Sequence, residues 1–114
     1  MQVYYLEIVT LEVDETCNTY EKLHNVNFGE AVPGLGNART VKLMNGGMIG
    51  VRAPMHESED PVIRPYLLVE DIHAATAALL ETGGEIAHPP MEIPEFGIFA
   101  IYIQGANHHG LWQI

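Results

Sequence analysis

The sequence predicts an α+β fold in which two βαβββ modules form an eight-stranded, curved mixed sheet. The sheet has a central cleft, and one helix per module lies on the outside. The same order of strand and helix patterns occurs in residues 1–53 and again in 62–114, and a polar segment, 54–61, separates the two. Each helix can cover only one face of its module. We therefore predict one domain, 1–114, with module one at 1–53, a linker at 54–61 and module two at 62–114.

The first module starts with a strand and a helix. Residues 2–9 alternate between two faces, which is typical of a strand. Asp14 is expected to cap the following helix, and Phe28-Gly29 is expected to end it. The predicted apolar stripe of this helix has spacings of four and three residues: Val13, Cys17, Tyr20 and Leu23.

The rest of the first module consists of a short strand at 30–32 and two longer strands at 38–44 and 48–53. Asn45-Gly46-Gly47 between the longer strands predicts a hairpin. A two-residue turn at Asn45-Gly46 would place Arg39 directly opposite Arg52, because the numbers of the cross-strand partners then have opposite parity.

The second module repeats this plan. Residues 62–69 predict a strand, Asp71 a helix cap, and Gly83-Gly84 the end of that helix. Its predicted apolar stripe is Ile72, Ala75 and Leu79. A short strand at 85–88 is expected to stop at Pro89-Pro90, and two further strands are predicted at 96–103 and 109–114.

Composition limits the partners. The chain has 15 acidic and 5 basic residues and a net charge of −10, which disfavours nucleic acid because phosphate binding needs clustered Lys and Arg. It has no run of eighteen apolar residues, so we expect no membrane span. The single cysteine, Cys17, suits a reducing compartment, and the N-terminus lacks a signal-peptide pattern. These features predict a cytoplasmic protein.

The end of the chain carries a family resemblance. A Gly-Ala-Asn turn at 105–107 is followed by Gly110-Leu111-Trp112-Gln113. This ending resembles the last hairpin of the vicinal oxygen chelate superfamily, which includes glyoxalase I, bleomycin resistance proteins and extradiol dioxygenases. The superfamily usually keeps four metal-binding positions on its strands. In this chain they are held by Tyr5, Gly50, Arg64 and Gly110.

No metal and no other cofactor is expected, because a tyrosine, two glycines and an arginine do not supply the N, O and S donors that a divalent metal requires. The resemblance also indicates which strand faces look into the cleft. The expected ligand-binding residues are Tyr5, Glu7, Arg39, Met48, Arg52, Arg64, Tyr66 and Trp112.

Two interpretations of these cleft residues remain open. The aromatic and apolar members either line a small-molecule site or fill the core between the modules. Three of the five basic residues, Arg39, Arg52 and Arg64, are predicted to converge in the cleft. This convergence favours a small anionic ligand such as a carboxylate.

The residues leave two functions open and identify no catalytic group. The first is a ligand-binding protein that resembles bleomycin resistance proteins. The alternative is an enzyme of the glyoxalase or dioxygenase type, a lyase or an oxygenase, with an altered metal site. The resemblance also implies a homodimer, while the expected partner in either case is a small molecule.

Overall fold

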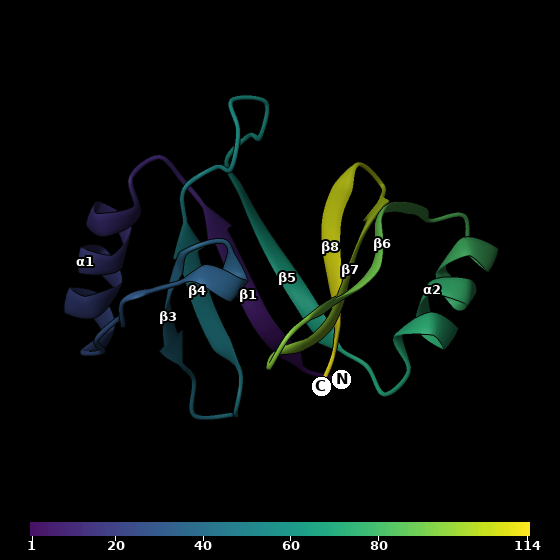
Figure 1. Ribbon diagram of the computed structural model, residues 1–114, viewed down its shortest axis with the longest axis horizontal. Helices are drawn as coiled ribbons and strands as arrows, with labels where there is room; N and C mark the ends of the chain where they lie inside the picture. The colour runs from purple at the N-terminus through teal and green to yellow at the C-terminus, as the bar shows by residue number, and fades with distance from the viewer. The chain divides into compact units, whose positions relative to one another are not determined.

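The computed structural model describes all residues, 1–114, and confirms the α+β class and the repeated βαβββ order (Figure 1). The first repeat comprises β1 (Val3–Val9), α1 (Val13–His24), β2 (Ala31–Val32), β3 (Ala38–Lys42) and β4 (Met48–Arg52). The second comprises β5 (Val62–Leu68), α2 (Ile72–Glu81), β6 (Glu85–Ile93), β7 (Gly97–Gln104) and β8 (Asn107–Gln113). A short 3₁₀ helix, η1 (Pro33–Leu35), precedes β3.

The eight strands form one mixed sheet in the order β2-β3-β4-β1-β5-β8-β7-β6. The β5–β8 pair is parallel, and the hairpin pairs β3–β4 and β7–β8 are antiparallel. By its contacts the chain divides into two compact units. We call Leu6–Ile63 the N-terminal unit, and Met1–Tyr5 together with Arg64–Ile114 the C-terminal unit. Strands β1 and β5 therefore each contribute residues to both units.

The N-terminal unit packs α1 against its strands through Ile8, Cys17, Phe28 and Val51. The helix differs from the prediction at both ends. Its N-cap is Glu12, without a side-chain cap, and Asp14 lies in the first turn. Asn25, in the left-handed conformation with φ 53°, ends the helix before Phe28-Gly29 is reached, since asparagine tolerates this conformation better than most residues.

The apolar stripe of α1 is shorter than predicted. Cys17 is fully buried, whereas the Leu23 side chain is 70% exposed. Phe28, which the prediction placed at the end of the helix, joins the core instead, and its backbone N–H donates to Glu21 Oε2 at 2.8 Å. The chain after α1 therefore supplies the apolar contact that Leu23 was expected to make.

The β3–β4 hairpin does not have the predicted two-residue turn. Leu43 N–H donates to the Gly47 carbonyl, which leaves Met44, Asn45 and Gly46 as a three-residue loop. Gly46 has φ 92°, the glycine-favouring region that such loops need. An odd loop pairs residues of equal parity, so Arg39 lies opposite Val51 and not opposite Arg52. The predicted Arg39–Arg52 pair is therefore wrong.

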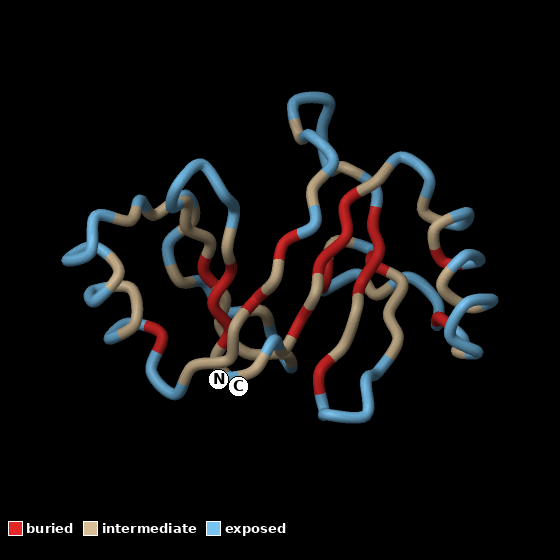
Figure 2. Tube along the Cα trace, turned by 180° about the vertical axis from the view of Figure 1, so that it is seen from behind, coloured by how far each residue is buried: buried red, intermediate tan, exposed pale blue.

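The C-terminal unit starts its helix as predicted. The Asp71 carboxylate accepts hydrogen bonds from the backbone N–H groups of His73 and Ala74 at 3.0 and 3.1 Å. Gly83, with φ 87°, follows the last turn of α2. The core beneath the helix consists of Ile72, Ala100 and Leu111, with Val69, Ala75, Ile98 and Tyr102 packed around it. Figure 2 shows buried residues gathered on the strands, with exposed loops and outer helix faces.

Strand β6 continues through Pro89-Pro90 to Ile93, which corrects the predicted stop at His88. Its register with β7 shifts between Ile86 and His88 and again between His88 and Met91. Strand β6 is the last strand of the sheet, so one side of its backbone has no partner strand. An edge strand with bulges tolerates prolines because their missing N–H groups need not bond to a neighbour.

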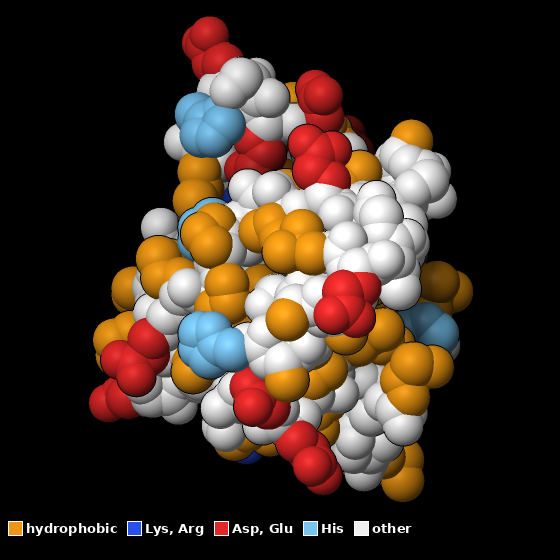
Figure 3. Space-filling model, turned by 90° about the vertical axis from the view of Figure 1, so that its right-hand side faces the viewer, with side chains coloured by type: hydrophobic (Ala, Val, Ile, Leu, Met, Phe, Trp, Pro, Cys, Tyr) orange, Lys and Arg blue, Asp and Glu red, His pale blue; other side chains and the backbone are white.

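The surface reflects the acidic composition. On the face drawn in Figure 3, acidic side chains are plainly visible and basic ones hardly show, in keeping with the net charge of −10. Neither helix has the length and apolar character needed to cross a membrane.

Candidate functional site

An aromatic cluster occupies one face of the C-terminal unit. The rings of Tyr5, Tyr66 and Trp112 lie 5.4 to 5.7 Å apart, and each side chain is no more than 3% exposed. Trp112 also donates its indole N–H to the Phe96 carbonyl at 3.1 Å. Half-buried Phe99 extends the cluster, with its ring 6.4 Å from that of Tyr66. Three of the predicted ligand-binding residues thus lie together.

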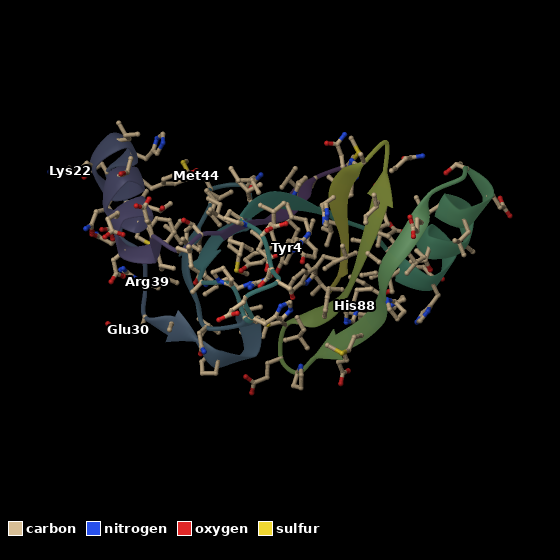
Figure 4. All side chains as sticks on the ribbon, turned by 90° about the horizontal axis from the view of Figure 1, so that it is seen from above. Tyr4, Lys22, Glu30, Arg39, Met44 and His88 are labelled. Atoms are coloured by element: carbon tan, nitrogen blue, oxygen red, sulfur yellow. The ribbon has the colours of Figure 1, made fainter.

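The burial of this cluster bears on the two earlier interpretations. Rings that are 97% or more buried act as core, since aromatic burial is a major contribution to stability. Two half-buried side chains border the cluster: Tyr4, whose ring lies 5.8 Å from that of Trp112, and His88, whose ring lies 4.8 Å from that of Phe99. Tyr4 and His88 are labelled in Figure 4.

Gly110 has a specific structural role in this cluster. A Cβ atom built at Gly110 would overlap the ring of Tyr66, which lies directly over the glycine. Tyr66 and Gly110 are also register partners in the parallel β5–β8 pair. The space at this superfamily metal position is therefore filled by an aromatic ring from the neighbouring strand.

Arg64 is a second buried group of the C-terminal unit. It lies two residues before Tyr66 on β5, so the two side chains share a face of the strand. Arg64 is only 6% exposed. The Tyr5, Arg64 and Gly110 positions that the resemblance assigns to metal binding thus hold a phenol, a guanidinium and a glycine covered by a ring.

A cluster of charged side chains is buried in the N-terminal unit. Arg52 at the end of β4 donates from Nε to Glu7 Oε2 at 2.8 Å. It also donates from Nη1 and Nη2 to the two carboxylate oxygens of Glu59, at 2.9 and 2.7 Å. The side chains of Arg52 and Glu7 are 6% and 8% exposed, and that of Glu59 is 18% exposed. One guanidinium is therefore bound by two carboxylates.

This arrangement keeps the guanidinium charged. The hydrogen bonds that Arg52 donates to Glu59 raise the pKa of Arg52 and outweigh the opposing effect of burial, and the charge of Glu7 adds to the increase. Arginine is suited to such a position because its planar fork can bind one carboxylate with two parallel hydrogen bonds and still use Nε for another.

Arg39 lies elsewhere in the N-terminal unit. Its Nη1 donates to Asp14 Oδ1 at 2.9 Å, and its Nε donates to the Gly29 carbonyl at 3.1 Å. Figure 4 shows Arg39 beside α1. The predicted convergence of three arginines is therefore wrong for Arg39, because the odd hairpin loop turns it to the helix-covered face. Met48 begins β4 and is half-buried, on the same strand face as Arg52.

Sequence reasoning treated 54–61 as a linker and missed its part in the site. A hollow of about 470 Å³ lies at this segment in the N-terminal unit and includes Glu59 in its wall. Its lining is Leu11, Pro54, His56, Glu57, Glu59, Asp60 and Pro61. The signal in the sequence was a group of three acidic residues between Pro54 and Pro61, next to a strand that ends in arginine. In the whole chain, no three His, Cys, Asp or Glu side chains lie close enough together to hold a metal ion.

Comparisons with known proteins give a weak sequence match and a strong fold match. No family model matches the chain. Proteins named "Putative glyoxylase CFP32" from Mycobacterium bovis and Mycobacterium tuberculosis are 28% identical over 87 residues. That match covers 72% of this chain, and the chain spans only about a third, 33%, of the length of these relatives.

Solved structures share the fold over nearly the whole chain. A hypothetical protein of Bacillus halodurans C-125 matches with a TM-score of 0.78 and 12% identity, covering 99% of this chain and 94% of that one. Methylmalonyl-CoA epimerase from Mycobacterium tuberculosis matches with a TM-score of 0.71 and 14% identity, covering 96% and 85%. These solved structures show the fold of the chain, and the glyoxylase match agrees with the resemblance of its last hairpin to the vicinal oxygen chelate superfamily.

Proposed function

We propose that the protein binds a small molecule and does not use the superfamily's usual metal positions. The observation that carries this proposal is the Tyr66 ring over Gly110. A carboxylate ligand to a metal would have to extend from residue 110 through space that the ring fills. The other three positions, Tyr5, Gly50 and Arg64, add no histidine or carboxylate.

The ligand class that we propose is a small anion. The support is the geometry of Arg52, which binds the Glu59 carboxylate through two parallel hydrogen bonds. Arg39 is not part of this proposal because it lies on the helix-covered face of the sheet, where it binds Asp14. The anion hypothesis therefore rests on Arg52, with Arg64 as the other buried arginine.

A thermal-shift comparison of matched ligands tests this proposal. Propionate, propionamide and propylamine have nearly the same size and carry a negative, no and a positive charge. We expect propionate to raise the Tm of the wild-type protein more than the other two at equal ionic strength. Stabilisation by propylamine alone would mean that the ligand is a cation. If neither this set nor a wider small-molecule panel raised the Tm, the proposal that the protein binds a small molecule would be wrong.

An enzyme of the glyoxalase or dioxygenase type is the second candidate. The match to proteins named as glyoxylases favours it, although this chain spans a third of their length. A metal-dependent enzyme on this fold would need ligands that the four superfamily positions do not supply. Metal content of protein purified without added metal distinguishes the two candidates, since stoichiometric Zn, Ni, Mn or Fe would favour the enzyme.

A further inference from the structure

One carboxylate of the loop between β4 and β5 accepts hydrogen bonds at both of its oxygens. Glu59 Oε1 accepts hydrogen bonds from Arg52 Nη1 at 2.9 Å and from the Met55 backbone N–H at 2.8 Å. Its Oε2 accepts from Arg52 Nη2 at 2.7 Å. The same side chain thus binds the buried arginine and organises its own loop.

The two carboxylates on Arg52 differ in how firmly they are placed. Glu7 belongs to β1 and has an 8% exposed side chain, so it is fixed by the strand. Glu59 belongs to an irregular loop, is 18% exposed, and has exposed neighbours in Ser58 and Asp60. Exposed loop segments open more easily than strands. Glu59 is therefore the less firmly placed of the two partners of Arg52.

We propose that Glu59 occupies the fork of Arg52 in place of a ligand, and that a small carboxylate binds Arg52 by displacing it. This inference rests on the proposed function. It identifies Arg52 as the group that binds the ligand and Glu59 as the group that the ligand displaces. The exchange keeps the charges balanced, because one bidentate carboxylate replaces another on the same guanidinium. The hollow of about 470 Å³ beside Glu59 gives the displaced side chain space to turn into.

The competition sets the expected affinity. Glu59 is tethered by a short loop, and tethered groups reach effective concentrations in the millimolar range or above. A bare carboxylate must compete with this internal group, so propionate is expected to bind the wild-type protein with a Kd of millimolar order or weaker. Replacing Glu59 by glutamine removes the competing charge, and propionate should then bind roughly tenfold or more tightly.

The experiment follows the Met55 backbone amide by NMR in ¹⁵N-labelled protein during titration with propionate, with propionamide as the neutral control. Displacement of Glu59 removes the acceptor of that amide. We expect its signal to shift and its hydrogen exchange to accelerate with propionate and not with propionamide. In Glu59→Gln the same titration should saturate at a concentration at least tenfold lower. Glu30→Gln removes the same charge from an exposed position outside the loop and the hollow and should behave like the wild type.

The outcomes separate this inference from the proposed function. Propionate binding that leaves the Met55 amide unchanged, with equal Kd values in wild type and Glu59→Gln, would overturn the displacement and leave ligand binding intact. Propionate binding in neither protein would overturn the displacement, and the wider small-molecule panel then decides whether the protein binds any ligand. If Glu59→Gln fails to fold by circular dichroism, the response of the wild-type Met55 amide to propionate and propionamide alone decides the question.

Discussion

The two repeats share one order of elements and are stabilised by different chemistry. The N-terminal unit buries Arg52 and Glu7, and its helix α1 has no side-chain N-cap. The C-terminal unit buries a cluster of aromatic rings around Trp112, and Asp71 caps its helix. The comparison teaches that a repeated βαβββ pattern fixes the positions of strands and helices and leaves the interactions within each repeat free to diverge.

The largest effect is expected at the charge cluster of the N-terminal unit. Arg52→Ala leaves the buried Glu7 carboxylate without this partner, which typically costs about 3–5 kcal/mol. Arg39→Ala breaks an ion pair with Asp14, whose side chain is 80% exposed, and should cost about 0.2–1 kcal/mol. Urea denaturation of both variants measures the difference. Equal losses of stability in the two variants would mean that the buried ion pairs of Arg52 contribute no more than the exposed ion pair of Arg39.

The next effect concerns the aromatic cluster of the C-terminal unit. Gly110→Ala places a methyl group against the Tyr66 ring and should destabilise by about 1–3 kcal/mol, the typical cost of overpacking. Gly29→Ala is the matched control, because its Cβ would lie 3.8 Å from the Thr40 carbonyl oxygen, an ordinary contact distance, and Gly29 has no positive φ. Thermal unfolding monitored by tryptophan fluorescence compares them. A Gly110→Ala protein as stable as Gly29→Ala would show that the ring does not need this glycine.

The two helix starts give a smaller difference. Asp71→Ala removes two hydrogen bonds to the N-terminus of α2 and should cost about 1 kcal/mol. Asp14→Ala removes no cap and should cost about 0.5 kcal/mol through the exposed ion pair with Arg39. Chemical denaturation of both variants tests the ranking, and a larger loss for Asp14→Ala would contradict the assignment of the caps.

The smallest effect is expected at the turn between β7 and β8. Gly105 and Ala106 form a two-residue turn with φ 58° and 64° between the paired residues Gln104 and Asn107. Ala106→Gly relieves left-handed strain and should stabilise by about 0.5 kcal/mol. Ala77→Gly, in the exposed face of α2, should instead destabilise by about 1 kcal/mol. Loss of stability in both variants would argue against strain at Ala106.

The sequence predicted most of the fold and less of the site, for physical reasons. Strand alternation and the Asp71 cap are local signals, and both are correct. The side of the sheet that Arg39 faces depended on the parity of one hairpin loop, and Asn45-Gly46-Gly47 permits loops of two or three residues. Composition alone could not show that Glu59 of a polar loop binds Arg52. The two residues are seven positions apart, and the chain between them follows no regular pattern.

The central claim of the proposal is that the superfamily's metal positions bind no metal in this protein. Calorimetric titration of the purified protein with Zn²⁺, Ni²⁺ and Mn²⁺ tests this claim. Tyr5, Gly50, Arg64 and the ring-covered Gly110 predict no tight one-to-one site for any of the three ions. A micromolar, stoichiometric site that Tyr5→Phe or Glu7→Gln abolishes would contradict this account and would favour the enzyme.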